Sequence, residues 1–186
     1  MNSAGEFADI DTPRLRLRLM NHAFLDACLR GRVSEGAELL GTALPLEWFE
    51  RVEFIARRWQ QLREEPDYAA FAPRAMLLRD TDRMVGHIGF HSAPDPEYLQ
   101  PMVGRGIEVG YTVFAADRRR GYAEEAVRGM ARWATLAHGV TQVVASISPN
   151  NLPSQQLAAK LGFMKVGEHI DEVDGPEDVL VWRLPS

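Results

Sequence analysis

Apolar and polar residues alternate strictly near the beginning of the chain. The stretch TPRLRLRLM, residues 12–20, has leucine at every second position and arginine between the leucines, a period of two that predicts a half-buried strand near a sheet edge. Two more strands are predicted at 74–78 and 84–91, because these apolar runs flank polar residues suited to a tight turn. Gly86 and Gly89 in the second run indicate that another backbone or a ligand approaches closely.

Helical spacing, with apolar residues three or four positions apart, governs two other stretches. It is weak over 22–44 and clear over 46–62, so we expect helical structure in both. Residues 92–106 instead contain three prolines and two glycines, which predicts a long loop of the kind that often has a functional role.

The second half of the chain alternates between strand and helix patterns. The predicted elements are a strand at 107–114, a helix at 122–137, a strand at 142–147, a helix at 152–161, and two final strands at 163–170 and 179–184 around a polar turn at 171–178. A strand, a crossover helix and a second strand imply parallel pairing. The sequence shows no internal repeat and no linker. We therefore predict a single mixed α/β domain over residues 1–186, with 1–11 flexible.

Length and composition limit the classes of protein to which the chain can belong. The chain has 186 residues, 46% apolar and 25% charged, which is ordinary for one globular domain. Its single cysteine excludes an internal disulfide and a zinc site built on cysteines, and we expect no metal. A formal net charge of −5 without a block of like charges disfavours a protein that grips nucleic acid. The longest apolar run is five residues and the amino terminus lacks a secretory pattern, so we expect no membrane span and a cytoplasmic location.

A candidate anion-binding corner lies between the strand at 107–114 and the helix at 122–137. The sequence there, VFAADRRRGYAEE, ends a strand, turns through three arginines and opens a helix beside the small residues Gly121 and Ala123. The first turn of a helix presents unpaired backbone N–H groups and a partial positive charge, which together bind phosphate. The alternative is an ordinary solvated arginine turn, and neither the P-loop nor the dinucleotide fingerprint occurs.

Two longer segments resemble a known family. IEVGYTVFAADRRRGYAEEA, and SISPNNLPSQQLAAKLGF further along the chain, resemble the GNAT family of acetyl-CoA-dependent N-acetyltransferases, and within it the ribosomal-protein N-terminal (alanine/serine) acetyltransferases. The family's pyrophosphate signature, Q/R-x-x-G-x-G/A, is matched by Arg118, Gly121 and Ala123. The resemblance runs from residue 12 to the end and is weakest over 22–72 and 92–105. It implies a central mixed sheet of about six to seven strands flanked by helices, with two parallel strands splayed apart at the cofactor site.

The resemblance also implies which residues bind coenzyme A. Backbone groups of Val113 and Phe114 would pair with the pantetheine arm, as an added strand does, and Asn151 would contact the same arm. The residues implied for the diphosphate are Arg118, Arg119, Arg120, Gly121, Tyr122 and Ala123. Arg119 stands where this branch often has glycine, which leaves the backbone amides in place but stiffens the loop.

Amide formation requires a neutral amine and then a proton for the departing thiolate, so an acid and a base are needed. Glu108 faces away from the apolar side of its strand and matches the glutamate of the family's E-I-G-Y motif. We expect it to act as the base, directly or through water; the alternative is a surface carboxylate paired with an arginine. Asn151 and Ser154 match the branch's N-x-x-S, which implies that the Ser154 hydroxyl protonates the thiolate, although Asn151 could simply cap a helix. Ala158 excludes the tyrosine acid that the wider family often has four residues after this serine.

Other polar and aromatic residues have simpler interpretations. His87 and His91 lie on the same side of their strand and could line a substrate cleft, although a buried or solvated strand histidine is the simpler interpretation. For Trp48 and Tyr98 we expect core packing rather than a role in an acceptor pocket. Cys28 is expected to pack on a helix.

The function implied is transfer of an acetyl group from acetyl-CoA to a primary amine by direct attack in a ternary complex. The acceptor stays open between a protein α-amine, an aminoglycoside, a polyamine and a free amino acid, because the segments that would shape its pocket show the least resemblance. The alternative is a non-catalytic acyl-CoA-binding sensor or assembly module on the same fold. A homodimer is implied by the resemblance alone.

Overall fold

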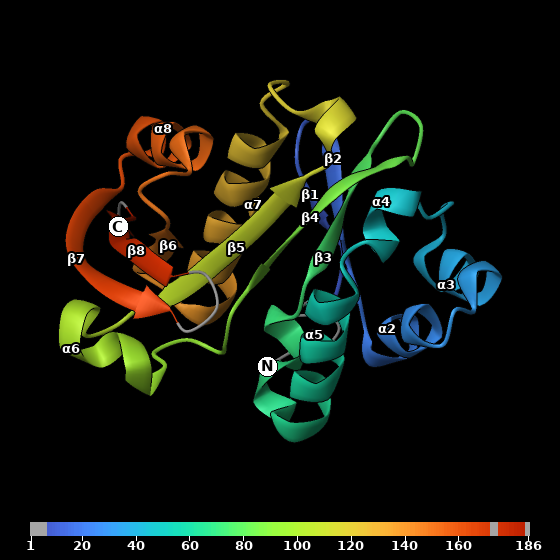
Figure 1. Ribbon diagram of the computed structural model, residues 1–186, viewed down its shortest axis with the longest axis horizontal. Helices are drawn as coiled ribbons and strands as arrows, with labels where there is room; N and C mark the ends of the chain where they lie inside the picture. The colour runs from blue at the N-terminus through green and yellow to red at the C-terminus, as the bar shows by residue number, and fades with distance from the viewer. Residues whose placement is uncertain (1–6, 172–174, 185–186) are drawn as a thin grey trace. The chain divides into compact units, whose positions relative to one another are not determined.

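A computed structural model describes residues 7–171 and 175–184 of the chain (Figure 1). Its strands are β1 (Ile10–Asp11), β2 (Leu15–Leu19), β3 (Arg74–Leu78), β4 (Met84–Phe90), β5 (Ile107–Val113), β6 (Gln142–Ile147), β7 (Met164–Asp171) and β8 (Gly175–Arg183). Its α-helices are α2 (His22–Leu29), α3 (Val33–Leu40), α4 (Leu46–Phe49), α5 (Val52–Glu64), α6 (Gln100–Val103), α7 (Tyr122–His138) and α8 (Leu152–Leu161). Short 3₁₀ helices are η1 (Pro66–Phe71), η2 (Glu97–Leu99) and η3 (Ala115–Asp117).

The strands follow the order β1-β2-β3-β4-β5-β6-β8-β7 in a mixed sheet, and the predicted α/β class is confirmed. The sheet has eight strands rather than six or seven, because β1 pairs with β2 at Ile10↔Leu17. A strand of two residues is too short to show a period in the sequence. The predicted flexibility of residues 1–11 falls partly on 1–6, which lie outside the described residues, while Ile10–Asp11 form β1.

Contacts divide the chain into two compact units. The first comprises the chain up to Gly89 together with Tyr111–Met130, and the second comprises Phe90–Gly110 and the chain from Ala131 onward. Both β5 and α7 therefore contribute residues to each unit. A single domain over 1–186 stays a prediction.

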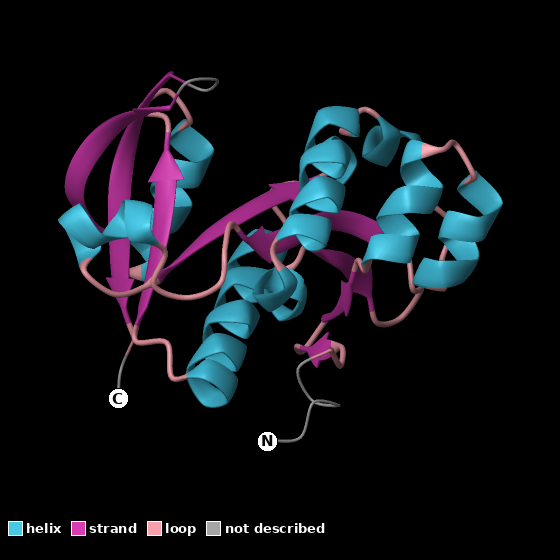
Figure 2. Cartoon of the chain, turned by 90° about the horizontal axis from the view of Figure 1, so that it is seen from below, coloured by secondary structure: helices cyan, strands magenta, loops and turns pink. Residues whose placement is uncertain are grey.

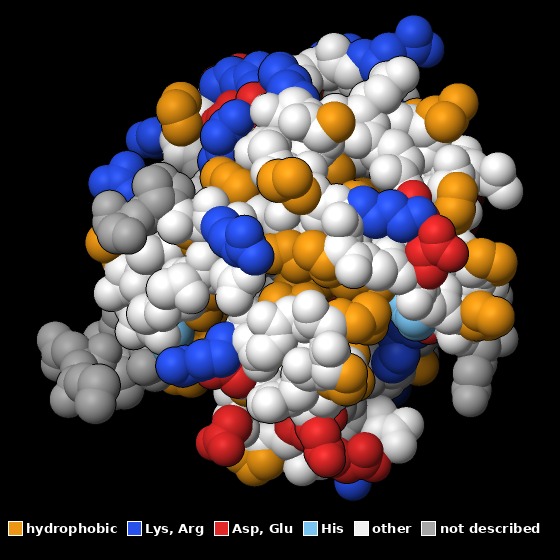
Figure 3. Space-filling model, turned by 90° about the vertical axis from the view of Figure 1, so that its left-hand side faces the viewer, with side chains coloured by type: hydrophobic (Ala, Val, Ile, Leu, Met, Phe, Trp, Pro, Cys, Tyr) orange, Lys and Arg blue, Asp and Glu red, His pale blue; other side chains and the backbone are white. Residues whose placement is uncertain are grey.

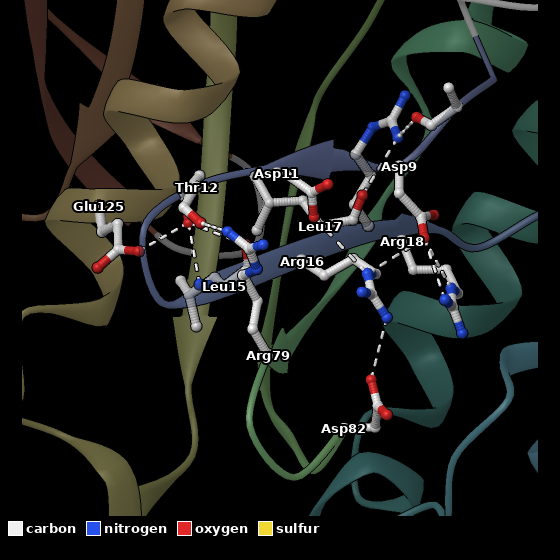
Figure 4. Close-up of polar contacts among 12 residues, drawn as sticks. Asp9, Asp11, Thr12, Leu15, Arg16, Leu17, Arg18, Arg79, Asp82 and Glu125 are labelled. Atoms are coloured by element: carbon white, nitrogen blue, oxygen red, sulfur yellow. Dashed lines mark hydrogen bonds and ion pairs between the residues drawn. The ribbon is translucent and has the colours of Figure 1, made fainter.

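The first unit contains the antiparallel strands β1 to β4. Leu15 and Leu17 of β2 are fully buried, as the alternation in the sequence predicts. Figure 4 shows the opposite, arginine face of β2, where acidic side chains from β1 and from the β3–β4 turn surround the guanidinium groups. The ion pairs on this face join Arg16 to Asp9, Asp11 and Asp82, and Arg18 to Asp9.

Helices cover both faces of this part of the sheet. Ala75 and Leu77 of β3 pack into a core with Trp48 and with residues of α2 and α5, and Figure 2 shows these helices gathered together. Gly129 of α7 lies on the other face, so close to the β1–β2 hairpin that a Cβ there would stand 2.7 Å from Thr12 Cγ2 and 3.6 Å from Leu17 Cδ1. The predicted helical stretch 46–62 is divided in two, since α4 ends at Phe49 and α5 begins at Val52.

Strand β6 is the central strand of the second unit. It runs parallel to β5 at Ile107↔Val143 and Glu108↔Val144, which confirms the parallel pairing predicted from the strand–helix–strand order. It pairs antiparallel with β8 along its whole length, and β7 pairs with the far side of β8. The parallel ladder comprises two residue pairs although β6 continues to Ile147.

Two segments of the second unit differ from the prediction. Residues 92–106 were expected to form a loop, but they contain η2 and α6. The polar turn expected at 171–178 is shorter, because β8 already begins at Gly175 and pairs Glu168↔Asp178 and His169↔Glu177 across the two strands; residues 172–174 lie outside the described residues.

The surface of the second unit mixes apolar and polar side chains. Figure 3 views the side with β7 and α8 and shows hydrophobic side chains set among polar ones. The most exposed apolar residues of these two elements are Ile170, Met164 and Leu152. Within residues 7–171 and 175–184, every helix falls short of the length and apolarity needed to cross a bilayer.

Candidate functional site

The predicted anion-binding corner follows directly from the end of β5 in the first unit. The Phe114 N–H donates to Val85 O at 2.9 Å, and the Phe114 carbonyl accepts from Asp117 N at 2.9 Å. Strand residues alternate in the edge to which their backbone groups point, so those of Val113 point away from β4. The Val113 carbonyl accepts from Arg118 Nε at 3.1 Å. The backbone of Val113 therefore points away from β4, with its carbonyl bound to Arg118, while Phe114 fixes the end of the strand to β4.

A nearly buried carboxylate anchors the turn after the strand. Asp117 is 3% exposed and accepts two hydrogen bonds from Arg83, at 2.7 Å from Nη1 and 2.8 Å from Nη2. Arg120 Nη1 lies 3.8 Å from the same carboxylate. The hydrogen bonds from Arg83 outweigh the effect of burial and lower the pKa of the Asp117 carboxyl. The carboxylate is thus a fixed negative group at the base of an arginine-rich turn.

A second anchor comes from the amino-terminal part of the chain. Arg14 Nη1 donates to the Arg120 carbonyl at 2.9 Å, and Arg14 Nε donates to Glu125 Oε2 at 2.6 Å. The guanidinium also lies over the Tyr122 ring, 4.9 Å from its centroid. Thr12 donates to the other oxygen of Glu125 at 2.7 Å, a contact visible in Figure 4. These contacts hold the turn in place before any ligand arrives.

The backbone of the turn has two residues in the left-handed region. Gly121 has φ +81° and Arg119 has φ +60°, and only glycine adopts such values without strain. This explains why glycine suits position 119, and it means that the backbone of Arg119 is strained. Arg118, Arg119 and Arg120 are all exposed. Within the described residues no ion pair or hydrogen bond of the Arg119 side chain is found, so its charge is available to an anion.

The candidate base, Glu108, lies in β5 within the second unit and is almost completely buried. Only 4% of the residue is exposed. Tyr98 donates its hydroxyl to Glu108 Oε2 at 2.8 Å, and His91 Nδ1 lies 3.5 Å from the same oxygen. Ser146 of β6 adds a further hydrogen bond. The alternative of a surface carboxylate paired with an arginine does not describe these surroundings.

The surroundings of Glu108 determine its charge. Burial by itself raises the pKa of this carboxyl, but the hydrogen bond and the positive charge of His91, with hydrogen bonds from Ser146 and Tyr98, outweigh burial and lower the pKa to about 2. Glu108 is therefore an ionised carboxylate at every physiological pH. A carboxylate with so low a pKa binds a proton only weakly.

His91 is the more exposed member of this group. Its side chain is 40% exposed, against 6% for the Glu108 side chain. The imidazole occupies space above Gly110, where a Cβ would stand 2.5 Å from His91 Nε2. Tyr98 is 51% exposed, so the core packing expected of it is wrong, because its hydroxyl reaches Glu108 from a largely solvated ring.

Asn151 and Ser154 meet at the start of α8, also in the second unit. Asn151 Oδ1 accepts from Ser154 N at 3.3 Å, which makes Asn151 the N-cap of the helix. The capping role left open in the sequence is therefore confirmed. Ser154 is partly buried in the first turn of the helix. Their roles towards a cofactor stay predictions.

His87 belongs to an aromatic cluster in the first unit. Its ring lies 5.5 Å from the Trp48 ring and 4.5 Å from the Phe54 ring, measured between centroids. Burial, together with the charges of Arg51 and Arg58, lowers the pKa of His87 to about 3. It is a buried, neutral core histidine. Trp48, fully buried, packs in the core as expected.

Sequence reasoning identified the contiguous residues of the turn but missed their distant partners. Arg83, Arg14 and Glu125 each act on the turn from another element, and Ser146 acts on Glu108 from β6. The available signal for Ser146 was its place in a strand predicted to run parallel to β5. No local pattern marked Arg83.

Comparison with known proteins gives a consistent result. Residues 14–164 match the family model described as "Acetyltransferase (GNAT) domain". The chain is 28% identical over 160 residues to the uncharacterized N-acetyltransferase YjdG of Bacillus subtilis, covering 83% of this chain and 89% of that protein.

Solved structures with low sequence identity share the fold. RimJ of Mycobacterium smegmatis, solved in complex with CoA-disulfide, superposes with a TM-score of 0.63 at 19% identity, covering 96% of this chain and 88% of the other. The ribosomal-protein-S5-alanine acetyltransferase of Vibrio fischeri gives a TM-score of 0.60 at 16% identity, covering 95% and 96%.

Proposed function

The chain belongs to the GNAT family of N-acetyltransferases, and from this premise we propose that it transfers an acetyl group from acetyl-CoA to the primary amine of a protein N-terminus or a small molecule. The observation that carries the proposal is the turn 118–123, which Arg83 and Arg14 hold through Asp117 and the Arg120 carbonyl. A turn fixed in this way presents backbone amides and guanidinium charge to a diphosphate at little cost in ordering.

The cofactor would lie along the end of β5 and the start of α7. The diphosphate would be bound by the residues of the turn, namely Arg118, Arg119, Arg120, Gly121, Tyr122 and Ala123. The pantetheine arm would pair with the backbone of Val113, whose groups point away from β4; the Phe114 carbonyl would have to accept a second hydrogen bond beside that from Asp117. Asn151 would contact the same arm through the part of its amide not used in capping.

Acetyl transfer would proceed by direct attack of the amine nitrogen on the thioester carbonyl. The nitrogen loses a proton, its lone pair forms the new C–N bond, and the C–S bond breaks to release a thiolate. The Ser154 hydroxyl would protonate the thiolate. The carboxylate of Glu108 would drive removal of the amine proton, directly or through a group between them.

Two measurements test the proposal. Coenzyme A should raise the melting temperature, because a ligand that binds only the folded state stabilises it, whereas ATP and NAD, which lack pantetheine, should raise it less. Thiol release from acetyl-CoA should then be assayed with peptides beginning in alanine or serine, a polyamine, an aminoglycoside and free amino acids. No stabilisation at millimolar coenzyme A would refute the proposal.

The same assay distinguishes an enzyme from the main alternative, a non-catalytic binding protein. A non-catalytic acyl-CoA-binding sensor would be stabilised by the cofactor but would release no thiol with any amine. The peptides come first in the panel because two structural neighbours are RimJ and a ribosomal-protein-S5-alanine acetyltransferase. A homodimer and a cytoplasmic location stay predictions, the first of them checked by sedimentation.

A further inference from the structure

We infer that His91 accepts the proton of the acceptor amine and that Glu108 acts as a positioning residue that holds its imidazole. The inference rests on the proposed function and deepens it, because it names the group that the amine meets. The observation behind this inference is a difference in exposure between two neighbouring side chains. The His91 side chain is 40% exposed and the Glu108 side chain 6%, and His91 Nδ1 lies 3.5 Å from Glu108 Oε2.

Glu108 is poorly placed to receive the proton itself. One of its oxygens already accepts from the Tyr98 hydroxyl at 2.8 Å and faces His91, and Ser146 adds a hydrogen bond from β6. An amine would have to displace these donors to reach a carboxylate that is almost closed to solvent. A carboxylate with a pKa of about 2 also has little affinity for a proton at neutral pH.

The contact with Glu108 selects one tautomer of His91. A carboxylate beside Nδ1 favours the form in which Nδ1 carries the hydrogen and donates it, and this leaves the lone pair on Nε2. Gly110 provides the space for that nitrogen, since a Cβ at this position would stand 2.5 Å from it. The imidazole thus has a fixed orientation and a defined basic atom, supported by a charge that stabilises the imidazolium once it forms.

The proposed step balances in atoms and charge. The ammonium N–H bond of the acceptor breaks and the proton moves to His91 Nε2, so that the imidazole becomes imidazolium next to the Glu108 carboxylate. The freed lone pair attacks the thioester carbonyl carbon, and the C–S bond electrons leave with sulfur. The nitrogen, now bonded to carbon, gives its second proton to water, while the thiolate takes a proton from Ser154 Oγ, which regains one from that water. The imidazolium returns its own proton to solvent.

The first experiment compares kcat, KM and rescue among three variants. His91→Ala should lower kcat about 100-fold or more while KM for acetyl-CoA stays within about twofold, and added imidazole should restore part of the rate. Glu108→Gln should also lower kcat, but imidazole should not rescue it because His91 still fills the site. Gly110→Ala should lower kcat by displacing the ring from a protein in which both His91 and Glu108 are intact.

The chain offers a matched control for the loss of a paired histidine. His169 Nε2 lies 3.5 Å from Glu177 Oε2 on the β7–β8 hairpin, and its side chain is 36% exposed. This pair has the same distance as the proposed one and a histidine of similar exposure, and among the described residues it lies on a different element, the β7–β8 hairpin. His169→Gln should keep the wild-type kcat, and a loss equal to that of His91→Ala would contradict the inference.

A second measurement does not depend on turnover. ¹⁵N NMR of the neutral imidazole should show Nδ1 protonated and Nε2 unprotonated in the wild type, and this preference should weaken in Glu108→Gln. A wild-type enzyme that acetylates amines, with His91→Ala equally fast and the tautomer unchanged in Glu108→Gln, would overturn the role of His91 and leave the proposed function standing. A wild type that binds acetyl-CoA but acetylates no amine would overturn both.

Discussion

Arg83 and Asp117 form a two-pronged ion pair, with Nη1 2.7 Å from Oδ2 and Nη2 2.8 Å from Oδ1. The pair joins the residue before β4 to the residue that precedes the arginine-rich turn, 34 positions later in the chain. A bidentate pair fixes orientation as well as distance. The turn is therefore held by the protein and does not depend on a ligand for its position.

Replacing Asp117 by Asn should loosen this turn. The variant loses the negative charge and one of the two oxygens that accept from Arg83. Only one of the two hydrogen bonds can then form. Because the arginine is half exposed, we expect the free energy of unfolding to fall by only about 1–2 kcal/mol. The dissociation constant of coenzyme A should rise about tenfold, since binding must then also order the turn. Denaturant unfolding and calorimetric titration measure the two effects.

Arg128→Gln serves as the matched control. Arg128 Nη2 lies 3.3 Å from Glu124 on the exposed face of α7, four residues away along the helix. Such a pair contributes about 0.3–0.5 kcal/mol, and it lies within α7. Equal changes in coenzyme A affinity for both variants would show that the Arg83–Asp117 pair has no special role.

The left-handed backbone at Arg119 leads to a second prediction. Arg119→Gly and Arg119→Ala remove the same charge, but only glycine relieves the strain at φ +60°. The glycine variant should therefore be about 1 kcal/mol more stable than the alanine variant, as measured by chemical denaturation. Both should bind coenzyme A more weakly by the same factor, roughly tenfold at low salt. Equal stability of the two variants would mean that the turn relaxes around residue 119.

Contiguous motifs were predictable because they encode their own geometry. The turn 118–123 and the start of α7 occur where the sequence placed them, since a strand end, a glycine and a helix start follow one another along the chain. The partners of the site were not predictable in this way. Arg83 meets Asp117, and Tyr98 meets Glu108, only after strands have paired in register, which no local pattern states.

The prolines show how composition misled the prediction for residues 92–106. Pro96 is the N-cap of η2, and Pro101 lies in the first turn of α6. Proline is tolerated at these positions because the backbone N–H that it lacks would have no partner inside the helix. Two of the three prolines therefore mark helix starts rather than a loop, and the short helix η2 brings Tyr98 to Glu108.

Cys28 should be unreactive in the folded protein. Its thiol is buried, 6% exposed, and accepts a hydrogen bond from Trp48 Nε1 at 3.3 Å. Burial raises the pKa of the thiol, which leaves little thiolate, the reactive form. A thiol reagent at pH 7 should modify the native protein at least about 100-fold more slowly than the denatured protein. Because the chain has one cysteine, immediate stoichiometric labelling of the native protein would contradict this placement.

His87 should make the fold sensitive to mild acid. Burial and the charges of Arg51 and Arg58 lower its pKa to about 3, below the value of about 6.5 for an exposed histidine. The unfolded chain therefore binds a proton that the folded chain rejects. The stability that follows is complete above pH 6.5 and is lost as the pH falls towards 3, amounting to about 2 kcal/mol between pH 7.5 and pH 5.

Two variants isolate this contribution. His87→Gln and His87→Phe cannot titrate, so their free energies of unfolding should fall by about 2 kcal/mol less than the wild type's between pH 7.5 and pH 5, whatever packing each has lost. Urea unfolding at pH 7.5, 6 and 5 measures the slopes. Parallel slopes for the wild type and both His87 variants would mean that His87 is protonated in the folded protein and that the aromatic cluster opens to admit the charge.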